Sequence, residues 1–149
     1  MKDALPTAVL VSLLALSACG GTDDRPAPVD TRNDACSWCR MSVSDLRFAA
    51  QLTAPGHEPK VFDDAGCLRD WLKAPREAGP WTPWVADHRT KEWVKAKDAL
   101  FTRAAVQTPM NSGLIAHSSA ASRDADPSAK AGTPVPVSEV VGPFSGGTK

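Results

Sequence analysis

The sequence of 149 residues contains no tyrosine and has no net charge, because 17 basic side chains balance 17 acidic ones. A protein that binds nucleic acid usually carries an excess of positive charge, so this balance argues against a nucleic-acid partner. No cluster of lysines and arginines indicates a polybasic membrane-binding patch either. The sequence also lacks a catalytic triad, a phosphate-binding loop and a pair of catalytic carboxylates, so we do not expect an enzyme.

The one strongly apolar stretch lies at the N-terminus and is too short to span a bilayer in the mature protein. Lys2 precedes an apolar segment over residues 4–16, and residues 16–19 (LSAC) have the form of a lipobox. We therefore expect residues 1–18 to be a lipoprotein signal peptide, with cleavage before Cys19 and acylation of its thiol. The lipid would anchor the protein to a membrane, facing the periplasm or the cell exterior. The alternative is an ordinary secretory signal with an incidental cysteine.

Residues 19–33 are rich in glycine, proline, aspartate and threonine and have almost nothing to bury, which predicts a flexible tether. Residues 34–144 alternate strand-like and helix-like segments and are numerous enough for one compact domain. The first half is predicted to contain a strand at 46–52, a strand at 60–63, a helix at 65–73 and a strand at 84–88. Asp63 or Asp64 is the expected N-cap of that helix.

The second half repeats this order more weakly. It is predicted to contain strands at 99–104 and 113–117, a poor helix at 120–130 interrupted by Pro127, and a last strand at 135–141. The predicted fold class is therefore α+β. Sequence identity between the halves is too low to establish a duplication, and only the order of the elements suggests one.

The cysteines number four, and Cys19 is assigned to the lipid anchor. Cys36, Cys39 and Cys67 remain, an odd number for an exported protein, so at least one thiol is free or held by something other than a disulfide. Cys36 and Cys39 form a CxxC motif that Met41 follows closely. Thiolate and thioether sulfur favour Cu(I) over hard cations. A Cys36–Cys39 disulfide is the alternative, and Cys67, early in a predicted helix, is expected to be a small buried apolar residue.

Further candidate ligands lie in the second half of the chain. Met110 belongs to a turn-rich loop, residues 108–113 (TPMNSG), which does not favour burial of its side chain in a core. His117 is close to Met110 in sequence and offers an imidazole, whereas His88 at a strand end suits either a structural or a ligand role. The predicted metal ligands are Cys36, Cys39, Met41 and Met110, with His117 as a further candidate.

Several short motifs occur together behind the lipobox. They are Cys36-x-x-Cys39-x-Met41, Arg47-Phe48-Ala49-Ala50-Gln51, Phe62-Asp63-Asp64-x-Gly66-Cys67-Leu68, Val85-x-Asp87, Trp93 with Ala96 and Ala99, and Thr108-Pro109-Met110-x-Ser112-Gly113. In this order they resemble the NosL family of copper-binding lipoproteins, accessory proteins of nitrous oxide reductase. The resemblance implies two small ββαβ units in one domain, one bound Cu(I), and delivery of copper to the copper-sulfide centre of the periplasmic reductase.

Two positions depart from the family pattern: Arg40 stands where glycine is frequent, and His117 where an aromatic residue is common. A thiol–disulfide oxidoreductase is the main alternative, but such enzymes place CxxC at a helix N-terminus after a strand, and here the motif follows a tether. A structural zinc site would need four good ligands. We therefore expect a membrane-anchored Cu(I) chaperone whose partners are a recipient copper enzyme, most simply nitrous oxide reductase, or its assembly proteins.

Overall fold

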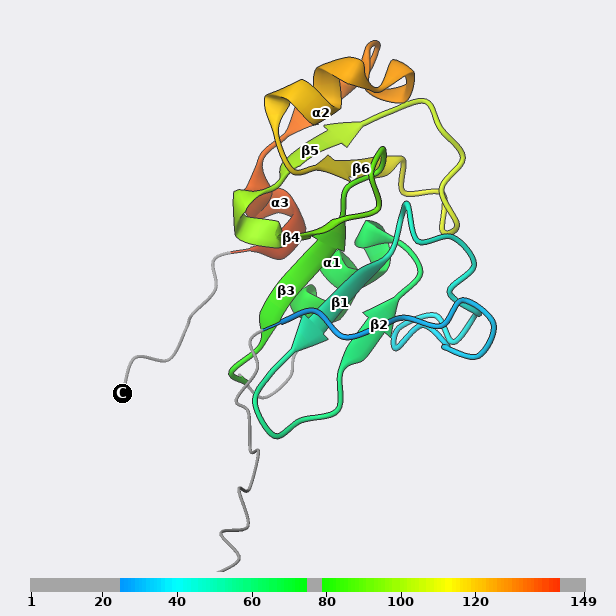
Figure 1. Ribbon diagram of the computed structural model, residues 1–149, viewed down its shortest axis with the longest axis vertical. Helices are drawn as coiled ribbons and strands as arrows, with labels where there is room; N and C mark the ends of the chain where they lie inside the picture. Colours follow the sequence, from blue (N-terminus) through cyan, green and yellow to red (C-terminus); the bar gives the residue numbers. More distant parts are fainter. Residues whose placement is uncertain (1–24, 75–78, 143–149) are drawn as a thin grey trace, which may run out of the picture.

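The computed structural model describes residues 25–74 and 79–142, which form two antiparallel sheets with helices packed against them (Figure 1). The fold is α+β, as predicted. The predicted signal peptide and Cys19 lie outside the described residues, as does the tether as far as residue 24. None of the helices within the described ranges has the length and apolar character that a membrane span requires.

Four strands form the first sheet in the order β2-β1-β3-β4, and every neighbouring pair is antiparallel. The strands are β1 (Ala50–Thr53), β2 (Lys60–Phe62), β3 (Thr82–Ala86) and β4 (Trp93–Lys95). β1 is central and all of its residues are buried. Because side chains alternate along a strand, Leu52 faces the core while Gln51 and Thr53 face the other side of the sheet. Thr53 there accepts a hydrogen bond of 3.0 Å from the indole nitrogen of Trp84.

Residues 25–28, which belong to the predicted tether, lie against this second face of the first sheet. The side-chain amide of Gln51 accepts a hydrogen bond from the backbone N–H of Ala27 (2.8 Å) and donates one to its carbonyl (3.1 Å). Figure 1 shows the segment in blue, crossing the sheet. The fully buried amide of Gln51 is satisfied in this way, so contacts with the domain begin before residue 34.

Helix α1 (Ala65–Lys73) has the bounds that the sequence predicts. Asp64 is the N-cap, because its side chain accepts a hydrogen bond from the backbone N–H of Gly66. Leu68 and Trp71 are buried on the face that packs against the first sheet. The local sequence thus determines this helix through its amphipathic spacing and a polar cap.

Three strands form the second sheet in the order β6-β5-β7, again antiparallel. The strands are β5 (Leu100–Arg103), β6 (Leu114–His117) and β7 (Thr133–Val135), and between β6 and β7 come α2 (Ala120–Ala125) and the 3-10 helix η2 (Pro127–Ala129). Pro127 begins η2, which accounts for the predicted interruption. β5-β6-α2-β7 therefore repeats β1-β2-α1-β3, with the first strand of each unit at its centre, and the chain contains two ββαβ units.

The predicted strand at residues 135–141 is wrong beyond its first residue. Strand β7 ends at Val135, and α3 (Val137–Val141) follows Pro136 directly. Pro136 has no N–H to donate to a sheet, and Val140 and Val141 are buried against the core as part of a helix that packs on α1. The sequence analysis also missed β4 and the 3-10 helix η1 (Ala96–Asp98) that follows it.

One core joins the two units. A single cluster of buried apolar side chains includes Leu52, Phe62, Leu68, Phe101, Leu114 and Val140. The backbone N–H of His88, just after β3, also donates to the carbonyl of Ala116 in β6 at 2.8 Å. The units therefore share their interior, which fixes the loops of one unit relative to those of the other.

Candidate metal centre

The three cysteines of the described chain meet at one place. The sulfur atoms of Cys36, Cys39 and Cys67 all lie within 4.8 Å of one another, although Cys67 is 28 residues or more from the other two in sequence. Cys36 and Cys67 are buried and Cys39 is partly exposed, and no disulfide joins any of these three. Sulfurs that bind one ion at about 2.3 Å are about 3.8–4 Å apart, so small side-chain movements would complete a metal site.

A tight loop presents Cys36 and Cys39. The N–H of Cys36 donates to the carbonyl of Met41 at 2.7 Å, and the N–H of Arg40 donates to the carbonyl of Cys36 at 3.0 Å. Arg40 has a φ of 68°, in the left-handed region that favours glycine. The N–H of Ser37 donates to Val61 in β2 at 2.7 Å and ties the loop to the first sheet. The CxxC motif therefore lies in a turn, and not at the N-terminus of a helix.

Cys67 comes from the first turn of α1, and the sequence analysis missed its place beside the other thiols. Its neighbour Gly66 is in close contact with the loop of the second unit, because an added Cβ would lie 2.6 Å from Cβ of Ser112. A side chain at this position would push that loop away. The helix N-terminus also carries a partial positive charge, which favours negatively charged sulfur nearby.

The adjacent carboxylates of Asp63 and Asp64 each hold one loop of the site. Asp63 accepts a hydrogen bond of 3.0 Å from the N–H of Ser44, at the end of the segment that carries the CxxC motif. Asp64 accepts hydrogen bonds from the N–H of Met110 (3.1 Å) and from the hydroxyl of Ser112 (2.6 Å). The segments of Met41 and Met110 are therefore both fixed to the start of α1.

Met41 and Met110 are unusual for large apolar side chains because both are exposed, at 49% and 39% respectively. Met41 follows Cys39 by two residues in a loop closed by backbone hydrogen bonds, and Met110 lies in a turn whose Met110 N–H bonds to Asp64, the N-cap of α1. Neither side chain packs into the core cluster. Their thioethers are thus available at the surface, and their part in metal binding remains a prediction.

The thiols differ strongly in acidity because they share hydrogen bonds. A hydrogen bond from the thiol of Cys67 lowers the pKa of Cys36 to about 5 despite the burial that opposes it, and backbone N–H groups of Asp63, Cys39 and Trp38 add to the effect. The same hydrogen bond, together with burial, raises the pKa of Cys67, and burial raises the pKa of Cys39. Near neutral pH the cluster therefore holds one thiolate and two thiols, a form that is already partly prepared to bind a metal cation.

His117 is not part of the cysteine cluster. The structure groups it with His88 and Asp126 in a second buried set of possible ligands. Nε2 of His117 lies 3.0 Å from Oδ2 of Asp126, and Nδ1 of His88 lies 2.6 Å from the same oxygen. The sequence analysis considered the two histidines separately and gave no role to Asp126, because nothing in the local pattern connects residues that far apart.

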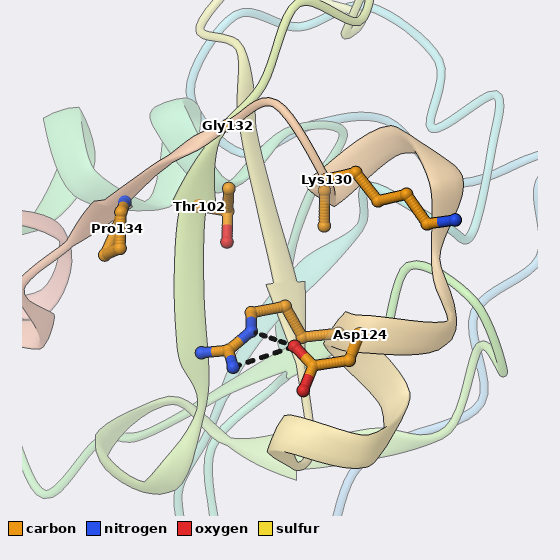
Figure 2. A pocket seen from close by; sticks show the side chains of 7 residues that line it. Thr102, Asp124, Lys130, Gly132 and Pro134 are labelled. Atoms are coloured by element: carbon orange, nitrogen blue, oxygen red, sulfur yellow. Dashed lines mark hydrogen bonds and ion pairs between the residues drawn. The ribbon is translucent and has the colours of Figure 1, made fainter.

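A pocket of about 310 Å³ lies elsewhere in the second unit (Figure 2). Its lining residues are Thr102, Arg123, Asp124, Ala129, Lys130, Gly132 and Pro134. The charges of Arg123 and Asp124 compensate each other in an ion pair of 2.8 Å. None of the clustered thiols or imidazoles lines this pocket.

Comparison of the chain with family models, with curated proteins and with solved structures finds no match. The function must therefore be argued from the site itself. The cysteine cluster can bind a metal ion, and the chemistry of its donors decides which one.

Proposed function

We propose that this protein is a membrane-anchored Cu(I) chaperone that delivers copper to an extracytoplasmic copper enzyme, with nitrous oxide reductase as the recipient. The observation that carries the proposal is the convergence of the sulfur atoms of Cys36, Cys39 and Cys67 from two distant segments. The anchor is supported by the lipobox at residues 16–19, and the recipient by the resemblance of the motifs to the NosL family.

The donor set favours Cu(I) over other metals. Hard cations such as Ca²⁺ and Mg²⁺ require oxygen ligands, whereas thiolate sulfur selects soft ions. Zn²⁺ also binds thiolates but takes four ligands in a structural site. Among the described residues, this cluster offers three cysteines and no histidine. Cu(I) is stable with two or three sulfur ligands, so the three thiols are sufficient for it.

A chaperone must also release its ion. Met41 and Met110 are exposed at the surface beside the CxxC segment and the start of α1, where an incoming or leaving ion would pass. A thioether is neutral and binds more weakly than a thiolate, so it accepts Cu(I) without adding charge. Each thiol that binds the ion releases one proton, and the thiolate of Cys36 is the first ligand available.

One observation favours a second candidate, a thiol–disulfide oxidoreductase. The lowered pKa of Cys36, about 5, is a property of the attacking thiol in such enzymes. However, the CxxC motif lies in a turn and has a third thiol within 4.8 Å, which is a better arrangement for a metal than for exchange with a substrate disulfide. The two candidates predict different activities for the reduced protein.

The test is a titration of the reduced full chain with Cu(I) in competition with a coloured chelator. We expect about one tightly bound Cu(I) per chain, a preference for Cu(I) over Zn²⁺, and negligible insulin reductase activity. Cys67→Ser should weaken binding strongly, because a hydroxyl is a hard ligand, and Ser138→Ala, an exposed position in α3, is a control that leaves the thiols and their loops in place. Strong reductase turnover without Cu(I) binding would assign the protein to the oxidoreductases.

A further inference from the structure

A second group of buried polar side chains lies where the two ββαβ units meet. It consists of His88, His117 and Asp126, which are 6%, 0% and 4% exposed. A single atom, Oδ2 of Asp126, lies 2.6 Å from Nδ1 of His88 and 3.0 Å from Nε2 of His117. Two nitrogens and one oxygen from three separate segments thus converge on a small volume inside the protein.

Hydrogen bonding alone does not satisfy this group. Each neutral imidazole has one donor and one acceptor nitrogen, so two donors directed at Asp126 leave an acceptor nitrogen on each ring. Among the described residues, Nδ1 of His117 has no hydrogen-bond partner although it is buried. Arg47, whose charge acts on Asp126, forms its ion pair with Asp45 instead. Apart from this nitrogen, the group offers one ligand atom from each of its three residues, and these atoms all lie within 4.8 Å of one another, as in a metal site.

We propose that His88, His117 and Asp126 form a second metal site, which binds a borderline divalent cation of the Zn²⁺ class. Two imidazole nitrogens and one carboxylate oxygen suit Zn²⁺, whereas Cu(I) prefers sulfur and Ca²⁺ prefers oxygen alone. Ligands that bind Zn²⁺ at 2.0–2.1 Å are about 3.3 Å apart, so the 3.0 Å separation of His117 from Oδ2 needs to open by about 0.3 Å and the 2.6 Å separation of His88 by about 0.7 Å.

Binding requires each imidazole to direct a lone pair at the ion. The ring proton of His117 then moves from Nε2 to Nδ1, which is free to hold it because no donor faces that nitrogen. His88 shifts its proton in the same way, from Nδ1 to Nε2. Each ring bound to the ion carries one proton, on the nitrogen that does not face the ion, and the ion takes the place of the two contacts with Asp126.

The surrounding structure holds the three ligands in place. Oδ1 of Asp126 accepts a hydrogen bond from the N–H of Ser128 at 2.8 Å, which leaves Oδ2 as the ligand atom. The backbone N–H of His88 bonds to Ala116, and its ring lies 5.1 Å from that of Phe48. Ligands that are oriented before binding increase metal affinity. The bound ion would link the segment after β3 in the first unit to β6 and α2 in the second.

This site is separate from the cysteine cluster and does not depend on the proposed copper function. The loop that bonds to Asp64 precedes β6, and His117 lies at the far end of that strand, roughly 10 Å further on at about 3.3 Å per residue. The two sites share no ligand. Loss of one should therefore leave the other able to bind its ion.

The test uses the full chain in which the three cysteines of the cluster are replaced, Cys36→Ser, Cys39→Ser and Cys67→Ser, titrated with Zn²⁺ alone. We expect one Zn²⁺ per chain, an X-ray absorption spectrum with nitrogen and oxygen neighbours only, and a higher unfolding temperature with the ion bound. Asp126→Asn, added to this background, should weaken Zn²⁺ binding by roughly tenfold or more, because Asn keeps the shape but not the charge.

Asp124→Asn is the matched control, since Asp124 is an exposed carboxylate in α2, two residues before Asp126, and should leave Zn²⁺ binding unchanged. If the triple variant does not fold, the wild-type chain with its thiols saturated by Ag(I) is titrated in the same way. A folded protein that binds no Zn²⁺, or binding that Asp126→Asn does not change, would show that the group is a hydrogen-bonded network only.

Discussion

At the scale of single residues, a few buried carboxylates hold together segments that are far apart in the sequence. Asp64 caps α1 and also binds the loop of Met110 and Ser112, 46 and 48 residues further along the chain. Asp87, just after β3, likewise joins distant segments, because it accepts hydrogen bonds from Ser118 and Ser122 in the second unit. The sequence analysis identified Asp64 as a possible helix cap but gave no reason to connect it to the second unit.

Asp64→Ala should remove the N-cap together with both hydrogen bonds to the second unit. A lost cap costs about 1 kcal/mol, and each lost hydrogen bond about 1 kcal/mol more, so we expect a fall of about 2–3 kcal/mol in the free energy of unfolding. Denaturant titration measures this change. Asp70→Asn is the control, because Asp70 is exposed and pairs only with its neighbour Arg69. Equal stability of the two variants would contradict the role assigned to Asp64.

Asp87 should make the stability depend on pH. Burial alone would raise its pKa, but hydrogen bonds from Ser118, Thr90 and Ser122 outweigh burial and hold the pKa well below its usual value. A carboxyl whose pKa is lower in the folded state stabilises the fold above its unfolded pKa of about 3.9. This stabilisation is lost as the pH falls below about 3.9 towards the lower pKa of Asp87 in the folded state.

We therefore expect Asp87→Asn to lower the free energy of unfolding at pH 7 by about 1–3 kcal/mol. The difference between wild type and variant should shrink in urea titrations carried out below about pH 4, where the unfolded-state carboxyl is protonated. A difference that stays constant over this range would show that the charge of Asp87 contributes nothing to stability.

At the scale of elements, the sequence predicts the helices and strands whose bounds are determined by local chemistry. The spacing of Leu68 and Trp71 and the cap at Asp64 give α1 its bounds. Residues 135–141 misled the analysis because four valines favour a strand, yet Pro136 ends β7 and the last valines pack as a helix against α1. Tertiary packing, which the local pattern does not contain, decided that segment.

Val140→Ala tests whether α3 is part of the core. Val140 is 1% exposed, so removing two methyl groups should lower the free energy of unfolding by about 2 kcal/mol. Ser138 lies on the exposed side of the same helix, and Ser138→Ala should change stability by less than about 0.5 kcal/mol. Denaturant unfolding of both variants gives the comparison. If both substitutions change the free energy of unfolding by the same small amount, α3 does not pack against the core as described.

At the scale of the whole molecule, two units of the same topology share one core, and the group of His88, His117 and Asp126 lies where they meet. The sequence predicted the α+β class and the repeated order of elements, and it brought Cys36 and Cys39 to attention through their spacing. The odd number of thiols left after lipidation indicated a free or otherwise held thiol, but Cys67 was expected to be a small buried apolar residue and its place beside the other two was not predicted. Only the folded chain brings Cys67 to the CxxC loop and His88 to His117 and Asp126, because tertiary packing between segments far apart in the sequence makes these contacts.

The central claim is that one Cu(I) is held by sulfur from both the CxxC loop and α1. X-ray absorption at the copper edge, on the Cu(I)-loaded full chain and on Cys67→Ser, tests it most directly. We predict a first shell dominated by sulfur in the wild type and the loss of one sulfur neighbour in the variant, with weaker binding. A first shell of nitrogen and oxygen, or a spectrum that Cys67→Ser leaves unchanged, would contradict the account.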